Sequence, residues 1–215
     1  MLRWLWATLW PPNPRPPSTS GFEIIDESRQ VDEECLAHYN PSRFYPVYVG
    51  DTFESRYQVL TKLGYGSCST VWLCRDITFV ISFPLTHISP LTQLSSKHKY
   101  VALKVCISKY PSIEREHAAY IHLREALRTH LGSLESALVR SSLADFELPG
   151  VEGLHQCFVF DPLTIDLVAT RAAVPFDEVL FKNTAFYVFC ALDFLHNKAQ
   201  MVHCGVSLFM THDPP

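Results

Sequence analysis

The chain has 215 residues, and its 18 lysines and arginines against 22 aspartates and glutamates give a formal net charge of −4. Hydrophobic residues make up 47% and charged residues 19% of the chain, which excludes a collagen-like or largely disordered protein. Because nonspecific phosphate binding needs clustered lysine and arginine, the charge also argues against direct nucleic-acid binding.

The cysteines and the apolar runs limit the class of protein further. The seven cysteines are odd in number and none are spaced as C-x-x-C, so we expect no zinc site, no other metal ligands and no disulfide framework. This usage is typical of a reducing compartment, which predicts a cytoplasmic or nuclear location or both. The apolar runs fall short of the roughly 20 residues of a membrane helix, so no membrane association is expected.

The first 56 residues are predicted to precede the first regular domain. Residues 1–20 are interpreted as a disordered or misassigned N-terminus, since five of the 15 prolines lie within residues 11–17 and exclude helix or sheet there. Residues 21–56 are predicted to be an N-terminal extension. Its acidic stretch, residues 26–34, is expected to be a solvated, flexible segment rather than a dock for basic substrates.

Residues 57–163 are predicted to form a domain of strands with one helix. Alternating or apolar segments predict five strands, at residues 57–63, 70–75, 100–106, 143–148 and 155–160. The first ends at Gly64, and the last two flank the turn at residues 149–153. Ser112 is a candidate N-cap for a helix that ends before Gly132. Residues 77–94 are apolar and contain two prolines, which predicts an insertion, because surface loops are normally short and polar.

Residues 164–215 are predicted to begin a helical domain that is cut short. Pro175 precedes a long helix with an apolar stripe that runs from Leu180 to Leu195, as expected of a helix packed on one side.

A glycine-rich loop lies between the first two predicted strands. Residues 63–71 read Leu-Gly-Tyr-Gly-Ser-Cys-Ser-Thr-Val, and such glycines let a backbone fold closely over phosphates and present N–H groups to them. The loop lacks the Gly-Lys-Ser/Thr ending of a Walker motif. Alone the pattern is weak, because glycines in a hairpin can serve only the turn.

Lys104 gives this loop a context. It interrupts the apolar segment Val101-Ala102-Leu103-Lys104-Val105, and a buried ammonium group needs an anionic partner. The next predicted helix offers Glu116, and Glu114 half a turn earlier. A strand lysine paired with a helix glutamate positions nucleotide phosphates in protein kinases. The alternative is a strand-edge lysine that extends into solvent.

With these motifs, the sequence resembles the eukaryotic protein kinases, in particular the serine/arginine-rich-protein-specific kinases. The resemblance runs from about residue 39 to residue 203 and is interrupted by the insertion. It is carried by residues 43–64, 69–76, 100–105, 146–150, 155–160 and 191–196. It implies an α+β fold: a kinase small lobe with a five-stranded antiparallel sheet and one helix, followed by the first helices of an incomplete α-helical large lobe.

The resemblance also implies ATP as the cofactor, bound by the small lobe. Lys104, paired with Glu116, would contact the phosphates, and Phe160 would guard the back of the adenine pocket. The residues that the resemblance assigns to ATP binding are Leu63, Gly64, Gly66, Val71, Ala102, Lys104, Glu116, Phe160, Asp161 and Leu163.

No catalytic residue is intact at the expected positions. In the family, His-Thr-Asp follows the long helix and an asparagine comes five residues after the aspartate, whereas this chain has His203, Gly205 in place of the aspartate, and Met210 in place of the asparagine. The chain also contains no Asp-Phe-Gly. Since phosphoryl transfer depends on positioning and on metal ions that neutralise charge, we expect an inactive chain that does not bind Mg²⁺ and binds ATP weakly or not at all.

The predicted function is therefore a serine/threonine-kinase-like, ATP-binding domain, and whether this chain is itself an enzyme stays open. By resemblance its partners are Arg/Ser-rich splicing proteins, which implies a role in regulating mRNA splicing. One alternative is a non-catalytic binding or scaffold module, a pseudokinase. Another is a mis-spliced gene product with unspliced segments at residues 77–94 and after Cys204, which uninterrupted transcript coverage through both segments would refute.

Overall fold

The computed structural model describes residues 20–21, 25–26, 28–77, 99–163 and 177–202. These residues fall into two compact units. The first contains the described residues up to Ile113 together with Leu143–Leu163, and the second contains Glu114–Ser142 and residues 177–202. Nearly all of the stretch interpreted as a misassigned N-terminus, and all of the predicted insertion except Ile77, lie outside the described residues.

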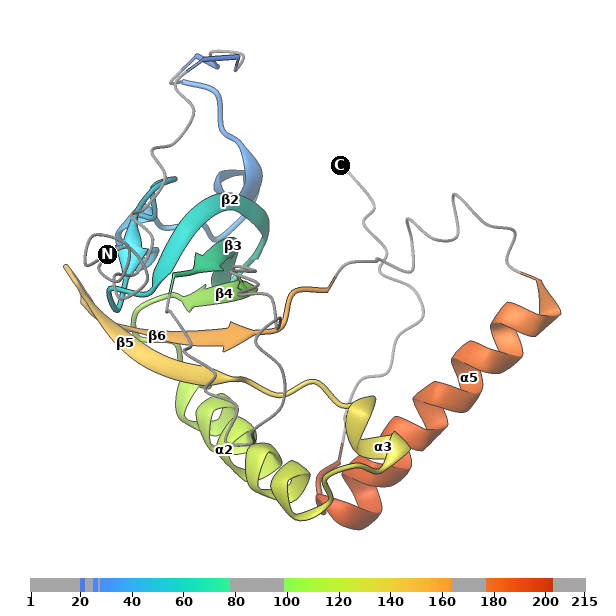
Figure 1. The fold of residues 1–215 in the computed structure, drawn as a ribbon. Coiled ribbons are helices and arrows are strands. Elements are labelled where there is room, and N and C mark those ends of the chain that lie inside the picture. The colour runs from blue at the N-terminus through green and yellow to red at the C-terminus, as the bar shows by residue number, and fades with distance from the viewer. Residues whose placement is uncertain (1–19, 22–24, 27, 78–98, 164–176, 203–215) are drawn as a thin grey trace, which may run out of the picture. The chain divides into compact units, whose positions relative to one another are not determined.

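The first unit is built on a six-stranded antiparallel sheet (Figure 1). Side by side, its strands are β1 (Thr52–Phe53), β2 (Tyr57–Gly66), β3 (Ser69–Asp76), β4 (Lys99–Cys106), β6 (Gly153–Phe160) and β5 (Ala144–Gly150). The predicted α+β fold with an antiparallel sheet is confirmed, and all five predicted strands are present. The count of five was one too low, because the two residues of β1 are too few to show any alternation.

The hydrophobic core of the first unit lies on one face of this sheet. Val59 and Cys74 are register partners on β2 and β3, and Leu103 and Val159 are partners on β4 and β6; all four are fully buried in one cluster. Paired residues project to the same face, and neighbours along a strand alternate between faces. Lys104, the neighbour of Leu103, therefore projects from the opposite face.

The N-terminal extension contains two short 3-10 helices, η1 (Asp32–Cys35) and η2 (Pro41–Arg43). The carboxylates of Asp32 and Glu33 form ion pairs with Lys62 on β2. The side chain of Glu33 is only 14% exposed, so the expectation of a solvated, flexible acidic segment is wrong for Glu33, whereas the side chain of Asp32 is 47% exposed. Arg43 joins the extension to the end of β4, since its guanidinium donates to the carbonyl oxygens of Ser108 and Lys109.

The second unit consists of helices: α2 (Ile113–Thr129), α3 (Leu134–Ala137), α5 (Glu178–Asp193) and the π-helical turn η3 (Phe194–Lys198). α2 begins directly after Ser112, as predicted, and Gly132 follows its end with a φ of 88°, a conformation that suits glycine. At the start of α5, the side chain of Asp177 accepts a hydrogen bond from the backbone N–H of Leu180 at 2.8 Å, which caps the helix.

A small apolar cluster holds the second unit together. Leu123 and Ala126 of α2 are buried with Phe194 and Ala199, and a ring nitrogen of His122 lies 2.7 Å from the carbonyl oxygen of Ala199. Within the described part of the chain, no helix is long and apolar enough to cross a membrane.

Candidate nucleotide-binding site

The glycine-rich loop is the hairpin between β2 and β3. Gly66 pairs with Ser69, so the turn itself consists of Ser67 and Cys68. Neither Gly64 nor Gly66 has a positive φ, and a β-carbon added to either would meet no atom within 4 Å. The hairpin itself therefore does not require these glycines, and the interpretation that they serve only the turn finds no support. Their missing side chains leave room for a group from outside the chain.

Leu63 lies in a β-bulge at the base of this hairpin. Lys62 pairs with Trp72 and Gly64 pairs with Val71, so Leu63 has no partner on β3. A bulge of this kind bends the strand and changes the direction of the side chain next to it. Leu63 is half exposed, so its isobutyl group remains available to an apolar ligand.

The predicted residues Gly64, Val71 and Lys104 lie in one row across β2, β3 and β4. Gly64 on β2 is the register partner of Val71 on β3, Val71 is the partner of Lys104 on β4, and Lys104 is the partner of Phe158 on β6. The antiparallel register places these side chains on one face of the sheet, opposite the core. Gly64 and Lys104, which are 40 residues apart in sequence, are thus brought together on this face.

A second row lies two residues further along the strands on the same face. Leu73 is the partner of Ala102, and Ala102 is the partner of Phe160. Ala102 and Phe160 are buried, and the ring centroids of Phe160 and Phe158 are 6.4 Å apart. We call the face that carries these two rows, Val71, Leu73, Ala102, Lys104, Phe158 and Phe160, the Lys104 face.

Lys104 is half-buried in the middle of this sheet and not at its edge. β4 pairs with β3 on one side and with β6 on the other side at this residue, so the alternative of a strand-edge lysine is wrong. Its ammonium group lies 5.9 Å from the ring centroid of Phe158, a cation–π distance. The ammonium group is the positive charge that the row offers to an anionic ligand.

The other predicted site residues lie apart from these rows. Asp161 and Leu163 follow β6 directly and are exposed. Glu116 lies on α2, in the second unit, so its ion pair with Lys104 stays a prediction. His203 and Gly205 lie outside the described residues.

The described residues hold no group of three histidine, cysteine, aspartate or glutamate side chains that could bind a metal ion. Both Asp-Phe pairs of the chain lie in regular secondary structure, one on β5 and one where α5 meets η3. Asp145 is half-buried on β5 opposite Phe158, and Asp193 accepts a hydrogen bond from the side-chain amide of Asn197 at 2.6 Å.

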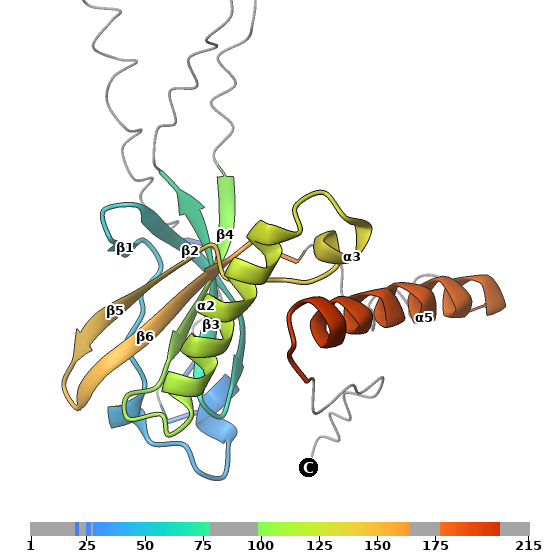
Figure 2. The ribbon, with the colours of Figure 1, turned by 90° about the horizontal axis from the view of Figure 1, so that it is seen from below.

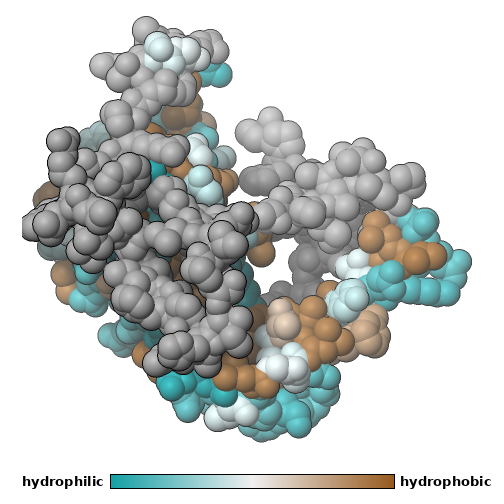
Figure 3. All heavy atoms as spheres, in the orientation of Figure 1, coloured by the Kyte–Doolittle hydropathy of each residue, from teal (hydrophilic) through white to brown (hydrophobic). Residues whose placement is uncertain are grey.

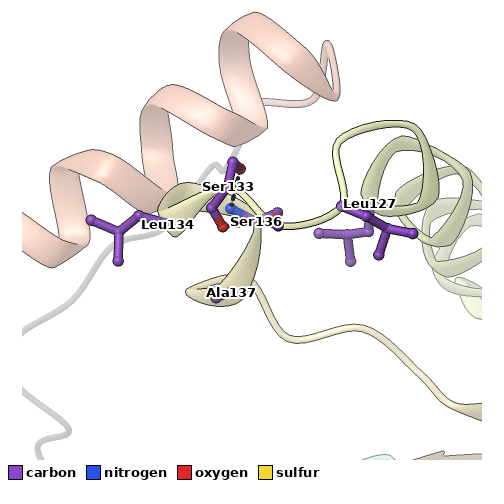
Figure 4. Close-up of a pocket in the computed structure, with 7 residues that line it drawn as sticks. Leu127, Ser133, Leu134, Ser136 and Ala137 are labelled. Atoms are coloured by element: carbon purple, nitrogen blue, oxygen red, sulfur yellow. Dashed lines mark hydrogen bonds between the residues drawn. The ribbon is translucent and has the colours of Figure 1, made fainter.

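An open pocket of about 610 Å³ lies in the second unit, between the end of α2 and α3 (Figure 4). Leu127, Leu134 and Ala137 line it, and the backbone N–H of Ser136 donates to the hydroxyl of Ser133 at its edge. None of the residues predicted to bind ATP lines this pocket, so it is separate from the Lys104 face.

Sequence reasoning did not find the partners of Lys62 beside the glycine-rich hairpin. Lys62 lies 29 residues from Glu33, and no local pattern links a lysine on an alternating strand to an acidic segment so far away. Arg43 was included in the resemblance without a role, and its contacts with Ser108 and Lys109 span 65 and 66 residues of sequence.

No protein-family model matches the chain. A serine/threonine protein kinase of Aspergillus fumigatus is 37% identical over 206 residues, which cover 94% of this chain and 47% of that relative. SRSF protein kinase 3 of Sus scrofa is 30% identical over 206 residues, covering 93% of this chain and 32% of the relative.

A third relative is the serine/threonine-protein kinase SRPK of Physarum polycephalum, 30% identical over 177 residues that cover 80% of this chain and 37% of the relative. This chain is homologous to SRPK-type serine/threonine protein kinases. It spans about half the length of the Aspergillus relative and about a third of the other two. The predicted resemblance to SRPK-type kinases is confirmed, and the antiparallel sheet corresponds to the small lobe of such a kinase.

Proposed function

We propose that this chain provides the ATP-binding small lobe of an SRPK-type serine/threonine kinase and binds ATP on the Lys104 face. One observation carries the proposal: the glycine-rich hairpin, Val71 and Lys104 form a continuous row across three strands. Such a row offers backbone N–H groups and an ammonium group to phosphates. The row formed by Ala102 and Phe160 offers an apolar surface of the kind on which an adenine ring packs.

Each part of the row has a separate task in this proposal. Gly64 and Gly66 leave the space in which phosphates approach the backbone. The ammonium group of Lys104 neutralises phosphate charge, and its position beside Phe158 keeps the lysine side chain along the sheet. Leu63, exposed by the bulge, covers the adenine from the hairpin side. The backbone groups of Asp161 and Leu163 bind its edge.

We further propose that the chain does not transfer the phosphoryl group by itself. The support lies in the sequence, where Gly205 and Met210 occupy the positions at which the family has a catalytic aspartate and a metal-binding asparagine. Without the aspartate, no base accepts the proton of the substrate hydroxyl. Without the metal ligands, no metal ion neutralises the charge that develops on the phosphoryl group. ATP binding is then weak and independent of Mg²⁺. For the partner, we propose the Arg/Ser-rich splicing proteins.

Two assays on the purified chain test these proposals. Photolabelling with an azido-adenine ATP analogue, followed by peptide mapping, is expected to label β3, β4 or the residues after β6, and excess ATP is expected to prevent it. Labelling confined to the second unit would contradict the proposed site. With radiolabelled ATP, Mg²⁺ and an Arg-Ser-repeat peptide, we expect no transfer above that of a boiled sample; transfer that Lys104→Met abolishes would contradict the proposed inactivity.

The alternative function is a non-catalytic binding or scaffold module, and α5 favours it. Several large apolar side chains of this helix are at least half exposed, namely Val179, Phe181, Phe186 and Phe189, and the helix contains no buried residue. The apolar residues of α5 are brown in Figure 3. If the chain is a protein-binding module, polar substitutions on α5 should abolish binding to a defined protein partner and leave the affinity for ATP unchanged.

A further inference from the structure

Lys62 of β2 joins the glycine-rich hairpin to the N-terminal extension. Its ammonium nitrogen lies 2.9 Å from Oδ2 of Asp32 and forms a second ion pair with the carboxylate of Glu33. Both acidic residues belong to η1, and the side chain of Glu33 is only 14% exposed. This ammonium group is therefore held between two carboxylates, one of which is largely removed from water.

The surroundings of Lys62 restrict it further. The ammonium nitrogen lies 5.6 Å from the ring centroid of Tyr65 and 5.7 Å from that of Trp72. Trp72 is the register partner of Lys62 on β3, and its indole N–H donates to the hydroxyl of Thr70 at 2.9 Å. Although burial disfavours the charged ammonium group, its hydrogen bonds to the two carboxylates raise the pKa of Lys62.

The position of Lys62 along β2 gives these contacts their significance. It is the last paired residue before the bulge at Leu63, and Gly64 follows immediately. β1 pairs with β2 only at Tyr57 and Gln58, so in the sheet the hairpin end of β2 is hydrogen-bonded to β3 alone. A strand end with a single partner is a region of low local stability, and η1 supplies an additional attachment there.

We propose that Lys62, held by Asp32 and Glu33, is a positioning residue that fixes the bulge and the glycine-rich hairpin in the conformation that ATP binds. Lys62 acts from the face opposite Lys104, because its partner Trp72 alternates with Val71 on β3. It therefore does not touch the nucleotide. The proposal rests on the proposed ATP site for its effect on affinity, whereas the effect on the hairpin does not depend on ATP.

The experiment compares charge-removing variants with matched controls elsewhere in the first unit. Lys62→Met and Glu33→Gln break the attachment, and the swap of Lys62→Glu with Glu33→Lys restores opposite charges. Lys109→Met and Glu152→Gln are the controls, since Lys109 and Glu152 form an exposed ion pair at 3.3 Å that does not involve β2. Two quantities are measured: amide hydrogen exchange of residues 63–69 without nucleotide, and the dissociation constant for ATP.

We expect Lys62→Met and Glu33→Gln to accelerate exchange in the hairpin about tenfold and to weaken ATP binding about five- to tenfold, the range for a partly buried ion pair. Exchange in β4 and β6 stays unchanged, the swap recovers most of both effects, and the controls behave as the wild type. Unchanged hairpin exchange in Lys62→Met, or a swap as defective as the single variants, would overturn the proposal. If the wild type does not bind ATP but hairpin exchange responds as expected, the ATP site fails and the attachment of the hairpin stands.

Discussion

A β-carbon at Gly150 would lie 2.3 Å from Nε2 of His155. In the β5–β6 hairpin (Figure 2), Gly150 is the register partner of Gly153 and His155 is the partner of Leu148, so Gly150 and His155 lie diagonally across the two strands. His155 is fully buried, with Nδ1 2.9 Å from the carbonyl oxygen of Cys106 and its ring packed edge-on against Tyr45 at 5.3 Å. Because these contacts hold the imidazole in place, the hairpin accommodates it only where no side chain is present.

Gly150→Ala is therefore expected to destabilise the chain by about 1–3 kcal/mol, the usual cost of overpacking a rigid site. Urea unfolding measures the loss. Adding His155→Ala to Gly150→Ala removes the clash, so the double variant should lose less than the sum of the two single variants. Strict additivity would show that the two residues do not interact as the structure indicates.

Gly64→Ala and Gly66→Ala are expected to separate stability from binding. Since each position has an ordinary φ and open space around it, alanine should leave the free energy of unfolding unchanged or raise it by about 0.5–1 kcal/mol. ATP affinity should nevertheless fall, because the added methyl groups occupy the space that the phosphates need. Full ATP affinity in both variants would mean that nothing approaches the hairpin at these glycines.

The buried cysteines predict a loss of stability at alkaline pH. Burial raises the pKa of the Cys74 thiol from 9.0 to about 12, and burial also raises the pKa of the Cys157 thiol. The unfolded chain then releases these protons at a lower pH than the folded chain, so the free energy of unfolding decreases as pH rises above about 9.

Urea unfolding between pH 8 and pH 10.5 tests this dependence. Cys74→Ala should show a shallower decrease than the wild type, whatever its stability at pH 8. Cys35→Ala is the matched control, because it removes an exposed cysteine instead of a buried one. Identical slopes in the wild type and in Cys74→Ala would contradict the assignment to buried thiols.

The strands and part of the candidate site could be predicted because their signals are local. Alternation locates β2 and β3, and a run that is apolar except for one lysine locates β4. The two-residue spacing between Ala102 and Lys104 already places both on one face of a strand. The row from Gly64 to Lys104 also needs the register, including the bulge at Leu63, and a one-residue slip would have moved every side chain to the other face.

The rest could not be predicted because it depends on contacts between distant segments. β1 has two residues and α3 has four, too few for a periodic pattern. The attachment of Lys62 to Glu33 and the close approach of His155 to Gly150 arise only once the chain is folded. From the sequence alone, an acidic residue that pairs with a distant lysine cannot be distinguished from one that is solvated. This explains the wrong prediction for Glu33 of η1.

Isothermal titration of ATP into the purified chain and into Lys104→Met tests the central claim most directly. Lys109→Met serves as the control, since Lys109 is an exposed lysine of the same unit. If ATP binds on the Lys104 face, Lys104→Met should weaken binding about tenfold or more, the loss of a charge-assisted contact with phosphate, while Lys109→Met and the wild type bind equally. ATP binding that is the same in all three proteins would contradict the account.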